Sequence, residues 1–297
     1  MSAQPARRIA LDVIMAVRDS DAYANLLLPV RLGRAKLSEA DAGLATELTY
    51  GTLRMQGYYD RIIAMAAGRD VDKIDPPILD VLRLACHQLL SMRVAQHASV
   101  DESVELAKTV GSNSAVGFVN GVLRTITRTD ADTWRARVLA EAGSGEESLA
   151  IEYSHPLWVA RAFRQVLTAE GREAELEALL AADNVAPRVS IAALPGESTL
   201  EELDAHPAEF SPVGAILDGG DPLKLGPVRE GRARVQDEGS QLAALALSRA
   251  RPIIPGEQWL DLCAGPGGKA ALLAAEARGG GAILTANELV PARAELV

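Results

Sequence analysis

The stretch Trp259–Glu276, WLDLCAGPGGKAALLAAE, decides the fold of the C-terminal part of the chain. It joins an apolar run at 258–263, which predicts a strand, to an alanine- and leucine-rich run, which predicts a helix. The loop between them holds three glycines within four residues: Gly265, Gly267 and Gly268. A second apolar run at 282–288 predicts a further strand that ends in Glu288. This order of strand, glycine loop, helix and acid-terminated strand is typical of doubly wound folds that hold a nucleoside cofactor.

The spacing within the loop does not fit the two common phosphate-binding motifs. The Walker A pattern requires glycine where Cys263 stands and serine or threonine where Ala270 stands. The dinucleotide pattern G-x-G-x-x-G also fails at Ala270, its third glycine position. A loop without a pyrophosphate site favours S-adenosylmethionine, which has no phosphates, and Glu288 is placed to accept hydrogen bonds from ribose hydroxyls. An ordinary tight turn in an α/β sheet is the alternative.

Residues 1–128 show helical periodicity throughout and no alternating β-type runs, which predicts an all-α bundle. Three helix starts are predicted from capping patterns: Ser38 with Asp41, Ser99 with Glu102, and Asp75 before Pro76. We therefore expect a first, helical domain over residues 1–140.

The middle of the chain mixes helix and strand signals. The stretch EAGSGEESLA at 141–150 is the best linker candidate. Beyond it the sequence predicts two helices, short strands at 188–194 and 233–236, and a short helix that begins at Thr199. We expect a small α+β module over 145–235 and the start of an α/β domain over 236–297.

Composition limits the class of protein further. The chain has 297 residues, 48% hydrophobic content and a net charge of −10. No apolar run approaches the roughly 20 residues of a membrane helix, and the histidines and cysteines lack zinc-ligand spacing. The acidity is uneven, because residues 1–128 carry 15 basic and 14 acidic side chains whereas residues 129–297 carry 15 and 26. We expect a cytoplasmic monomer that binds neither a membrane nor a metal.

Several motifs resemble one known family. LDLCAGPGGKAALLAA (260–275) and VQDEGSQLAA (235–244), with YSHPLWV (153–159) and PRVSIAA (187–193), resemble the RNA cytosine-5 methyltransferases named for the Nol1, Nop2 and Sun proteins. The helical part is similar to NusB, an RNA-binding transcription factor, in four stretches: DAYANLLLP (21–29), LATELTYGTLR (44–54), DPPILDVLRLACHQLL (75–90) and GFVNGVLRTI (117–126). The resemblance implies a multidomain chain: a NusB-like bundle, a small α+β module, and the beginning of a Rossmann-like methyltransferase domain.

The same resemblance implies a cofactor, a substrate and candidate contacts. The cofactor is S-adenosylmethionine and the substrate is small-subunit ribosomal RNA, methylated at carbon 5 of a cytosine. The implied cofactor contacts are Cys263, Ala264, Gly265, Pro266, Gly267, Gly268, Lys269 and Glu288. Candidate RNA contacts are Arg7, Arg8, Arg124 and Arg128 in the helical part and Arg229, Arg232 and Arg234 before VQDEGSQ, although a solvated basic strand edge explains the last three equally well. Asp261 either orients the loop or caps the helix after it.

The catalytic group is a separate question, because carbon 5 of cytosine is a poor nucleophile. Enzymes of the resembled family attack carbon 6 with a cysteine thiolate, which requires an accessible cysteine of low pKa. Cys86 lies in an apolar helical pattern and Cys263 lies in the cofactor loop. The family's cysteines occupy later Pro-Cys and Thr-Cys motifs, which these 297 residues do not include.

We therefore expect no catalytic residue in this chain, which would be an inactive fragment or a naturally shortened protein. The alternative is a non-catalytic RNA-binding factor of NusB type. A small-molecule methyltransferase is a weaker third reading, since a metabolite enzyme has no obvious use for an RNA-binding bundle.

Overall fold

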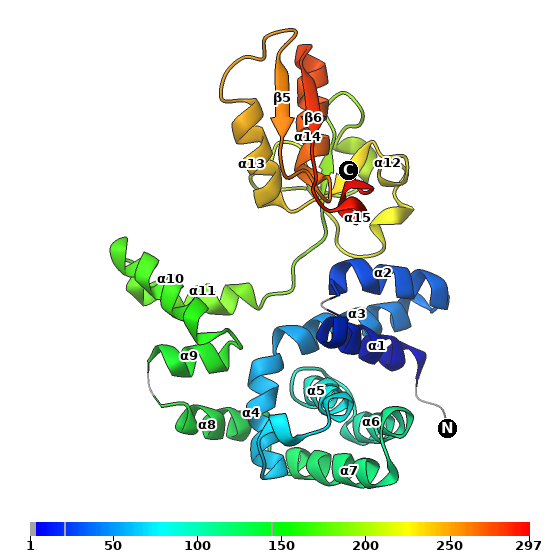
Figure 1. Cartoon of the computed structure of the whole chain (residues 1–297), viewed down its shortest axis with the longest axis vertical. Helices are drawn as coiled ribbons and strands as arrows, with labels where there is room; N and C mark the ends of the chain where they lie inside the picture. Colours follow the sequence, from blue (N-terminus) through cyan, green and yellow to red (C-terminus); the bar gives the residue numbers. More distant parts are fainter. Residues whose placement is uncertain (1–3, 21, 144) are drawn as a thin grey trace. The chain divides into compact units, whose positions relative to one another are not determined.

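The computed structural model describes residues 4–20, 22–143 and 145–297 (Figure 1). Internal contacts divide the chain into two units that meet at the bond between Ala186 and Pro187. This division differs from the expected boundaries near 140 and 235. The helices of the expected α+β module pack with the first unit and its strands with the second.

The first unit is helical. Its elements are α1 Pro5–Ser20, α2 Ala24–Ala35, α3 Glu39–Arg54, α4 Gln56–Ala67, η1 Val71–Lys73, α5 Pro76–Leu90, α6 Gln96–Val110, α7 Asn113–Thr127, α8 Ala131–Glu141, α9 Glu146–Glu152, α10 Leu157–Ala169, η2 Glu173–Glu175 and α11 Leu176–Asp183. Helix α5 lies at the centre and packs against α1, α3, α4, α6 and α7. Eleven consecutive residues of α5, from Ile78 to Gln88, are buried, as expected for a helix that is surrounded on all sides.

The predicted helix starts were partly correct. Ser38 caps α3, with its hydroxyl accepting a hydrogen bond from the Asp41 N–H at 3.1 Å. Asp75 precedes α5 and Pro76 occupies its first turn, although the Asp75 side chain makes no capping bond. The box at Ser99 was wrong, because α6 begins three residues earlier and the Ser99 hydroxyl donates back to the Ala95 carbonyl inside the helix.

The core of the helical bundle extends beyond residue 128. Trp134 on α8 is 2% exposed, belongs to the same apolar cluster as α1 and α3–α7, and donates its indole N–H to the Ile126 carbonyl at 3.0 Å. Val138, one turn later, joins the same cluster. Helix α8 therefore completes this core.

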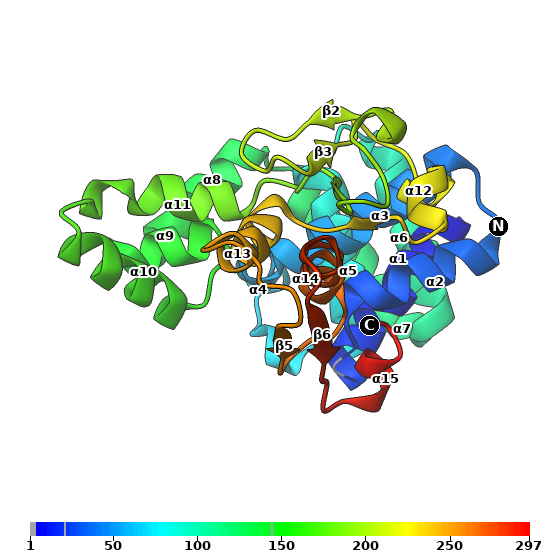
Figure 2. The same ribbon diagram turned by 90° about the horizontal axis from the view of Figure 1, so that it is seen from above.

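Helices α9, α10 and α11 form a smaller cluster around Ala160, Leu167 and Leu180, next to α8 (Figure 2). Within the expected linker at 141–150, α8 ends at Glu141 and α9 begins at Glu146, so its second half is helical. Tyr153 and Leu157 cover the small core of this cluster.

The second unit begins with a four-stranded antiparallel sheet in the order β2-β3-β1-β4. Its elements are β1 Ser190–Ala193, η3 Glu201–Leu203, β2 His206–Pro207, β3 Gly214–Ile216, η4 Pro222–Lys224, α12 Gly226–Arg229 and β4 Ala233–Val235. Strands β1 and β4 match the two predicted strands. The sequence reading missed β2 and β3, which have two and three residues and no alternating pattern to reveal them.

The rest of the second unit is a parallel βαβ unit preceded by a helix. Its elements are α13 Glu238–Ser248, β5 Gln258–Asp261, α14 Gly268–Gly280, β6 Ile283–Ala286 and α15 Pro291–Ala294. Strands β5 and β6 pair in parallel, with Trp259 opposite Leu284. Leu245 of α13 packs with Leu272 and Leu273 of α14 in a shared apolar cluster. The predicted order of strand, glycine loop, helix and strand is therefore present.

None of the helices among the described residues is long and apolar enough to cross a membrane. The described residues also contain no group of three or more histidine, cysteine, aspartate or glutamate side chains arranged to hold a metal ion.

Replacement of Trp134 tests the extent of the helical core. We expect Trp134→Ala to lower the free energy of unfolding of this unit by about 3–5 kcal/mol, because it leaves a large cavity and removes an internal hydrogen bond. Trp158→Ala is the matched control: Trp158 is 72% exposed, so its loss should change stability by less than about 0.5 kcal/mol. Urea unfolding of the chain measures both, and equal effects would contradict a core that includes α8.

Candidate functional site

The glycine loop joins the carboxyl end of β5 to the first turn of α14. Gly267 is the N-cap of α14 and has a φ of +102°, a conformation that residues with a side chain rarely adopt. A Cβ atom at this position would lie 2.8 Å from the Arg234 guanidinium and 3.0 Å from the Leu296 carbonyl oxygen. A Cβ on Gly265 would collide with the Glu288 carboxylate. Both glycines are required by the geometry of the loop itself.

Glu288 holds this loop. One oxygen of its carboxylate accepts a hydrogen bond from the Gly265 N–H at 3.0 Å, and the other accepts from the Val290 N–H at 3.0 Å. The side chain is 8% exposed. Donation by Val290 and then by Gly265 holds the pKa of the Glu288 carboxyl below its ordinary value. The structure thus brings Glu288 to the glycine loop, as expected, and bonds it there to the backbone.

Asp261 and Asn287 fix the two strand ends beside the loop. The Asp261 carboxylate accepts from the Cys263 N–H at 3.1 Å, and no side chain caps α14; Asp261 therefore orients the loop. The side-chain amide of Asn287 donates to the Leu262 carbonyl at 3.0 Å, and the backbone carbonyl of Asn287 accepts from the Ala264 N–H at 2.9 Å. Asn287 was missed in the sequence, where its only signal is its place beside Glu288.

The VQDEGSQ segment meets the loop from the other side. Lys269, in the first turn of α14, donates from Nζ to the Ser240 hydroxyl at 3.2 Å. The side chain of Gln236 lies beside Gly268: its amide carbon is 3.7 Å from where a Cβ on that glycine would be. Gln236 and Ser240 were quoted in the sequence motif but were not predicted to be site residues.

The arginines before VQDEGSQ have different surroundings. Arg234, a candidate RNA contact, instead directs its guanidinium to the loop, donating to the Pro266 carbonyl at 3.4 Å and the Leu296 carbonyl at 3.1 Å. Arg232 is held by Glu202 at 2.7 Å and Glu230 at 2.9 Å. Arg229 is well exposed and lies 4.0 Å from Glu230. Of the three, Arg229 alone extends into solvent.

The candidate RNA contacts of the helical unit also separate. Arg7 is 6% exposed, and its guanidinium donates to Gln88 at 2.7 Å and to Gln4; burial lowers its pKa. This buried position contradicts the prediction that Arg7 is an RNA contact. Arg8 is paired with Asp12 at 2.9 Å. Arg124 and Arg128 on and after α7 are exposed, and neither makes an ion pair with a described residue.

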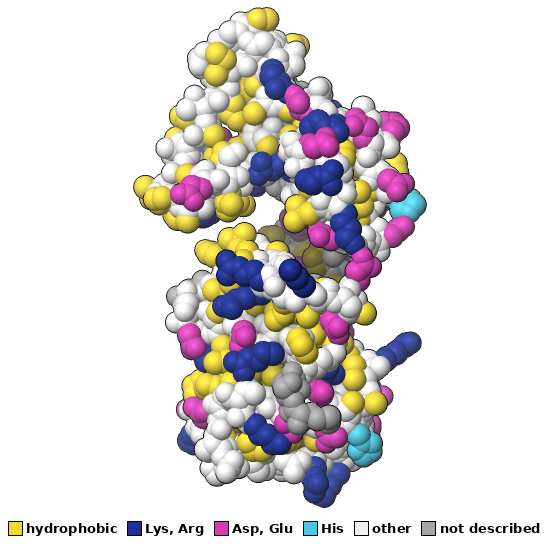
Figure 3. All heavy atoms as spheres, turned by 90° about the vertical axis from the view of Figure 1, so that its right-hand side faces the viewer, with side chains coloured by type: hydrophobic (Ala, Val, Ile, Leu, Met, Phe, Trp, Pro, Cys, Tyr) yellow, Lys and Arg dark blue, Asp and Glu magenta, His cyan; other side chains and the backbone are white. Residues whose placement is uncertain are grey.

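Figure 3 shows basic side chains spread over one face of the helical unit among apolar ones, rather than gathered into a single patch. On the same view of the second unit, basic and acidic side chains lie next to each other. The ion pairs of Arg232 are consistent with that pattern.

The two cysteines occupy the environments that the sequence predicted. Cys86 on α5 is fully buried, and burial strongly raises the pKa of its thiol. Cys263 is exposed in the loop after β5. Burial makes the Cys86 thiol inaccessible to a substrate.

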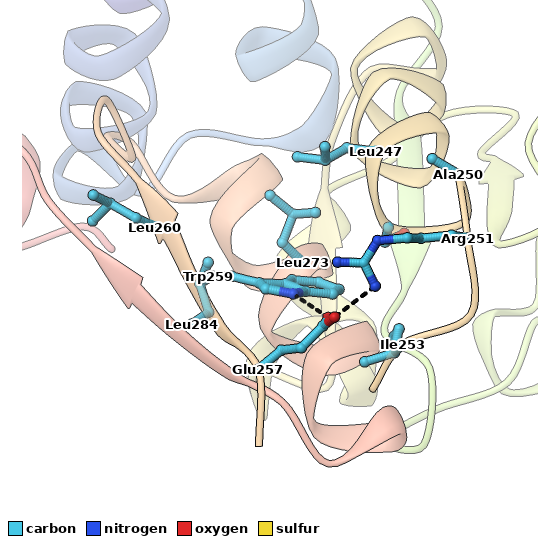
Figure 4. A pocket seen from close by; sticks show the side chains of 10 residues that line it. Leu247, Ala250, Arg251, Ile253, Glu257, Trp259, Leu260, Leu273 and Leu284 are labelled. Carbon is cyan, nitrogen blue, oxygen red and sulfur yellow. Dashed lines mark hydrogen bonds and ion pairs between the residues drawn. The ribbon is translucent and has the colours of Figure 1, made fainter. Parts of the chain in front are cut away.

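A separate recess of about 430 Å³ lies beside β5 and α13 (Figure 4). Leu273, Trp259 and Leu284 line its apolar part. On its rim Glu257 accepts from the Trp259 indole at 3.0 Å and pairs with Arg251 at 2.5 Å. No residue of the glycine loop lines it. Trp259 and Leu284 belong to the sheet face that packs with α13 and α14. Leu260 and Ile283, which alternate with them along the strands and so belong to the opposite face, are more than half exposed.

The helical unit contains a match to a known protein family. Residues 4–128 match the NusB family. This part of the chain is followed by a βαβ unit with a glycine loop at the carboxyl ends of its strands.

The chain as a whole has named relatives. It is 46% identical over 99% of its length to the Putative methyltransferase Rv1407 of Mycobacterium tuberculosis, strain H37Rv. It is 30% identical over 90% of its length to the Probable ribosomal RNA small subunit methyltransferase B of Bacillus subtilis. The chain spans 65% of the first relative and 59% of the second. The chain is therefore similar over nearly its whole length to proteins named as methyltransferases, and spans less than two thirds of the length of each.

One solved structure has the same fold over the full chain. The crystal structure of PH0851 matches all of this chain and 66% of its own length, with a TM-score of 0.74 and 18% sequence identity. At that identity the match shows the fold alone.

The bond from Glu288 to the loop can be tested by amide exchange. We expect Glu288→Ala to accelerate hydrogen exchange at Gly265, because the N–H loses its acceptor. Since the pKa of Glu288 is lowered in the folded state, the bond should persist at its ordinary pKa of about 4.3 and be lost only as the pH falls further. Glu295→Ala, an exposed acid on the same segment, should leave exchange at Gly265 unchanged. Exchange that Glu288→Ala does not alter would show that the carboxylate does not hold the loop.

Proposed function

We propose that this chain carries the cofactor-binding and RNA-binding parts of an enzyme that uses S-adenosylmethionine to methylate carbon 5 of a cytosine in small-subunit ribosomal RNA. The observation that carries the proposal is the loop at 263–269, supported by Glu288 from the neighbouring parallel strand. The names of the relatives support a methyltransferase. The motif resemblance supplies the cytosine and the position of methylation.

The residues around the loop fit this cofactor. Gly268 has only the Gln236 side chain within 4 Å of its Cβ position, and α14 begins with N–H groups that no side chain caps. Lys269 adds a positive charge at the same helix end. Each Glu288 oxygen accepts one backbone hydrogen bond and keeps a further lone pair with which to accept from a ribose hydroxyl. When bound, the cofactor supplies an electrophilic methyl group on a sulfonium. The loop, from Cys263 to Lys269, binds and orients it.

The NusB-like part of the helical unit is proposed to bind the RNA substrate. The match of residues 4–128 to the NusB family supports this role, and the word ribosomal in the name of the Bacillus subtilis relative supports the class of RNA. Arg124 and Arg128 are the candidates that remain exposed and unpaired among the described residues. Arg229 of the second unit is also exposed, with Glu230 at 4.0 Å.

The thiolate that attacks the cytosine is proposed to come from outside residues 1–297. Cys86 is buried with a raised pKa, and Cys263 stands in the loop assigned to the cofactor. The uncovered sheet face supports this view, because two strands with exposed Leu260 and Ile283 do not form a closed α/β core.

A non-catalytic RNA-binding factor of NusB type is the second candidate. The observation in its favour is that the helical unit has a core of its own, from α1 to α8, that does not depend on the glycine loop. The reading frame after Val297 distinguishes the two: Pro-Cys and Thr-Cys motifs there favour the enzyme.

RNA binding by the helical unit can be measured against salt. We expect the affinity of the chain for ribosomal RNA to fall as salt rises, because arginine–phosphate contacts release counterions. Replacing Arg124 and Arg128 by glutamine should reduce the slope of log K against log salt by about 1–2 in total. Arg161→Gln is the control, since Arg161 is already paired with Glu146. If the altered chain had the same slope as the unaltered chain, neither arginine would be an RNA contact.

Methyl transfer tests the location of the thiolate. We expect residues 1–297 to transfer no tritium from labelled S-adenosylmethionine to ribosomal RNA, because neither cysteine is placed to attack the base. A chain extended along its genomic reading frame should be active. Activity of the short chain that is lost in Cys263→Ser would instead make Cys263 the nucleophile.

A further inference from the structure

Gln236 occupies an unusual position between the antiparallel sheet and the glycine loop. Its backbone is fixed on both sides, because its N–H donates to the Ser190 carbonyl at 3.0 Å and its carbonyl accepts from the Gln241 amide at 2.9 Å. Its side chain is directed to the first residue of α14: both the amide carbon and Nε2 lie within 4.0 Å of the Cβ position of Gly268. The amide therefore lies at the uncapped N-terminus of a 13-residue helix.

The acceptor of this amide is unpaired. Gln236 is 6% exposed, and its Oε1 has no hydrogen-bond partner among the described residues, whereas its Nε2 donates weakly to the Ser240 hydroxyl at 3.4 Å. Gln241, one turn away and fully buried, shows the usual arrangement: its oxygen accepts from Ser211 at 2.6 Å and its nitrogen donates to Ser190 at 3.2 Å. Burying an acceptor without a donor is costly. An unpaired acceptor beside a binding loop indicates a ligand that brings the donor.

The charges around Gln236 define the chemistry of that donor. The nearby carboxylates are already engaged, since Asp237 accepts from the Gly239 and Ser240 N–H groups and Glu238 accepts from the Phe210 and Ser211 N–H groups. On the side of α14, Lys269 and the uncapped helix end are positive. The site therefore offers two groups for an anion and one neutral acceptor for a cation. An α-amino acid, with its carboxylate next to its ammonium, matches this set.

We propose that Gln236 Oε1 accepts a hydrogen bond from the α-ammonium group of the methionine part of S-adenosylmethionine, while Lys269 and the first turn of α14 receive its carboxylate. The assignment rests on the proposed function. It makes Gln236 a specificity residue for the amino-acid end of the cofactor, in a motif outside the glycine loop.

The test compares two ligands that differ in this end. S-Adenosylhomocysteine has the amino-acid part, and methylthioadenosine has the same nucleoside and thioether without it. We expect Gln236→Leu, which keeps the size and removes the acceptor, to weaken binding of S-adenosylhomocysteine roughly 10- to 100-fold and to leave methylthioadenosine unaffected. Gln236→Glu, which keeps an acceptor, should retain S-adenosylhomocysteine binding. Calorimetry on the chain measures all of these affinities.

Thermal unfolding without ligand separates this role from a structural one. Gln236→Leu should leave the melting temperature unchanged or higher, because it removes a buried acceptor without a partner. Gln241→Leu is the matched control and should lower the melting temperature, since it breaks three hydrogen bonds. Equal losses for both ligands in Gln236→Leu, or no loss for either, would overturn the assignment. Failure of the unaltered chain to bind S-adenosylhomocysteine would overturn the cofactor site itself and Gln236 with it.

Discussion

The hydrogen bond from the Gly265 N–H to the Glu288 carboxylate is the contact on which the candidate site depends. It joins two residues that are 23 positions apart, and it forms because parallel strands end at the same edge of a sheet. The paired register of β5 and β6 carries Asp261 and Ala286 to that edge together. The loop after β5 and the acid after β6 therefore meet without any long connection. Asp261 and Asn287 then bond the remaining backbone groups at the two strand ends.

Local sequence patterns predicted which helices and strands form better than they predicted where each element begins and ends or which elements pair with each other. The helices of the first unit and the order around the glycine loop follow from periodicity, because one face of each element is buried. Ser99 shows where this fails: its pattern fits a helix start, yet the chain enters α6 three residues earlier and buries it. Strand β2 has two residues and owes its existence to its pairing with β3. Such pairing is set by distant residues, which no local window contains.

The arginines show the same limit at the level of single side chains. Charge and sequence position alone suggested that all seven candidates are available to RNA. The structure assigns Arg7 to the interior beside Gln88, Arg232 to two glutamates and Arg234 to the Pro266 carbonyl. Each partner lies 30 or more positions away except Glu230, which is two positions from Arg232. A basic residue can therefore be proposed as an RNA contact only after its hydrogen-bond and ion-pair partners within the protein are known.

The second unit connects its sheet to its loop through one short segment. Strand β4 carries Arg234, whose guanidinium reaches the Pro266 carbonyl; Gln236 follows against Gly268; and Ser240, in the first turn of α13, receives the Lys269 ammonium. Arg234 and Gln236 are alternate residues of an extended segment, and Ser240 follows in the first turn of the next helix, so all three contact the same side of the loop. Glu288, which follows β6, contacts the loop separately through the Gly265 N–H. A ligand in the loop would therefore be bounded by groups from both sheets. The antiparallel sheet is in this respect part of the site, and the position of β4 contributes to the shape of the loop.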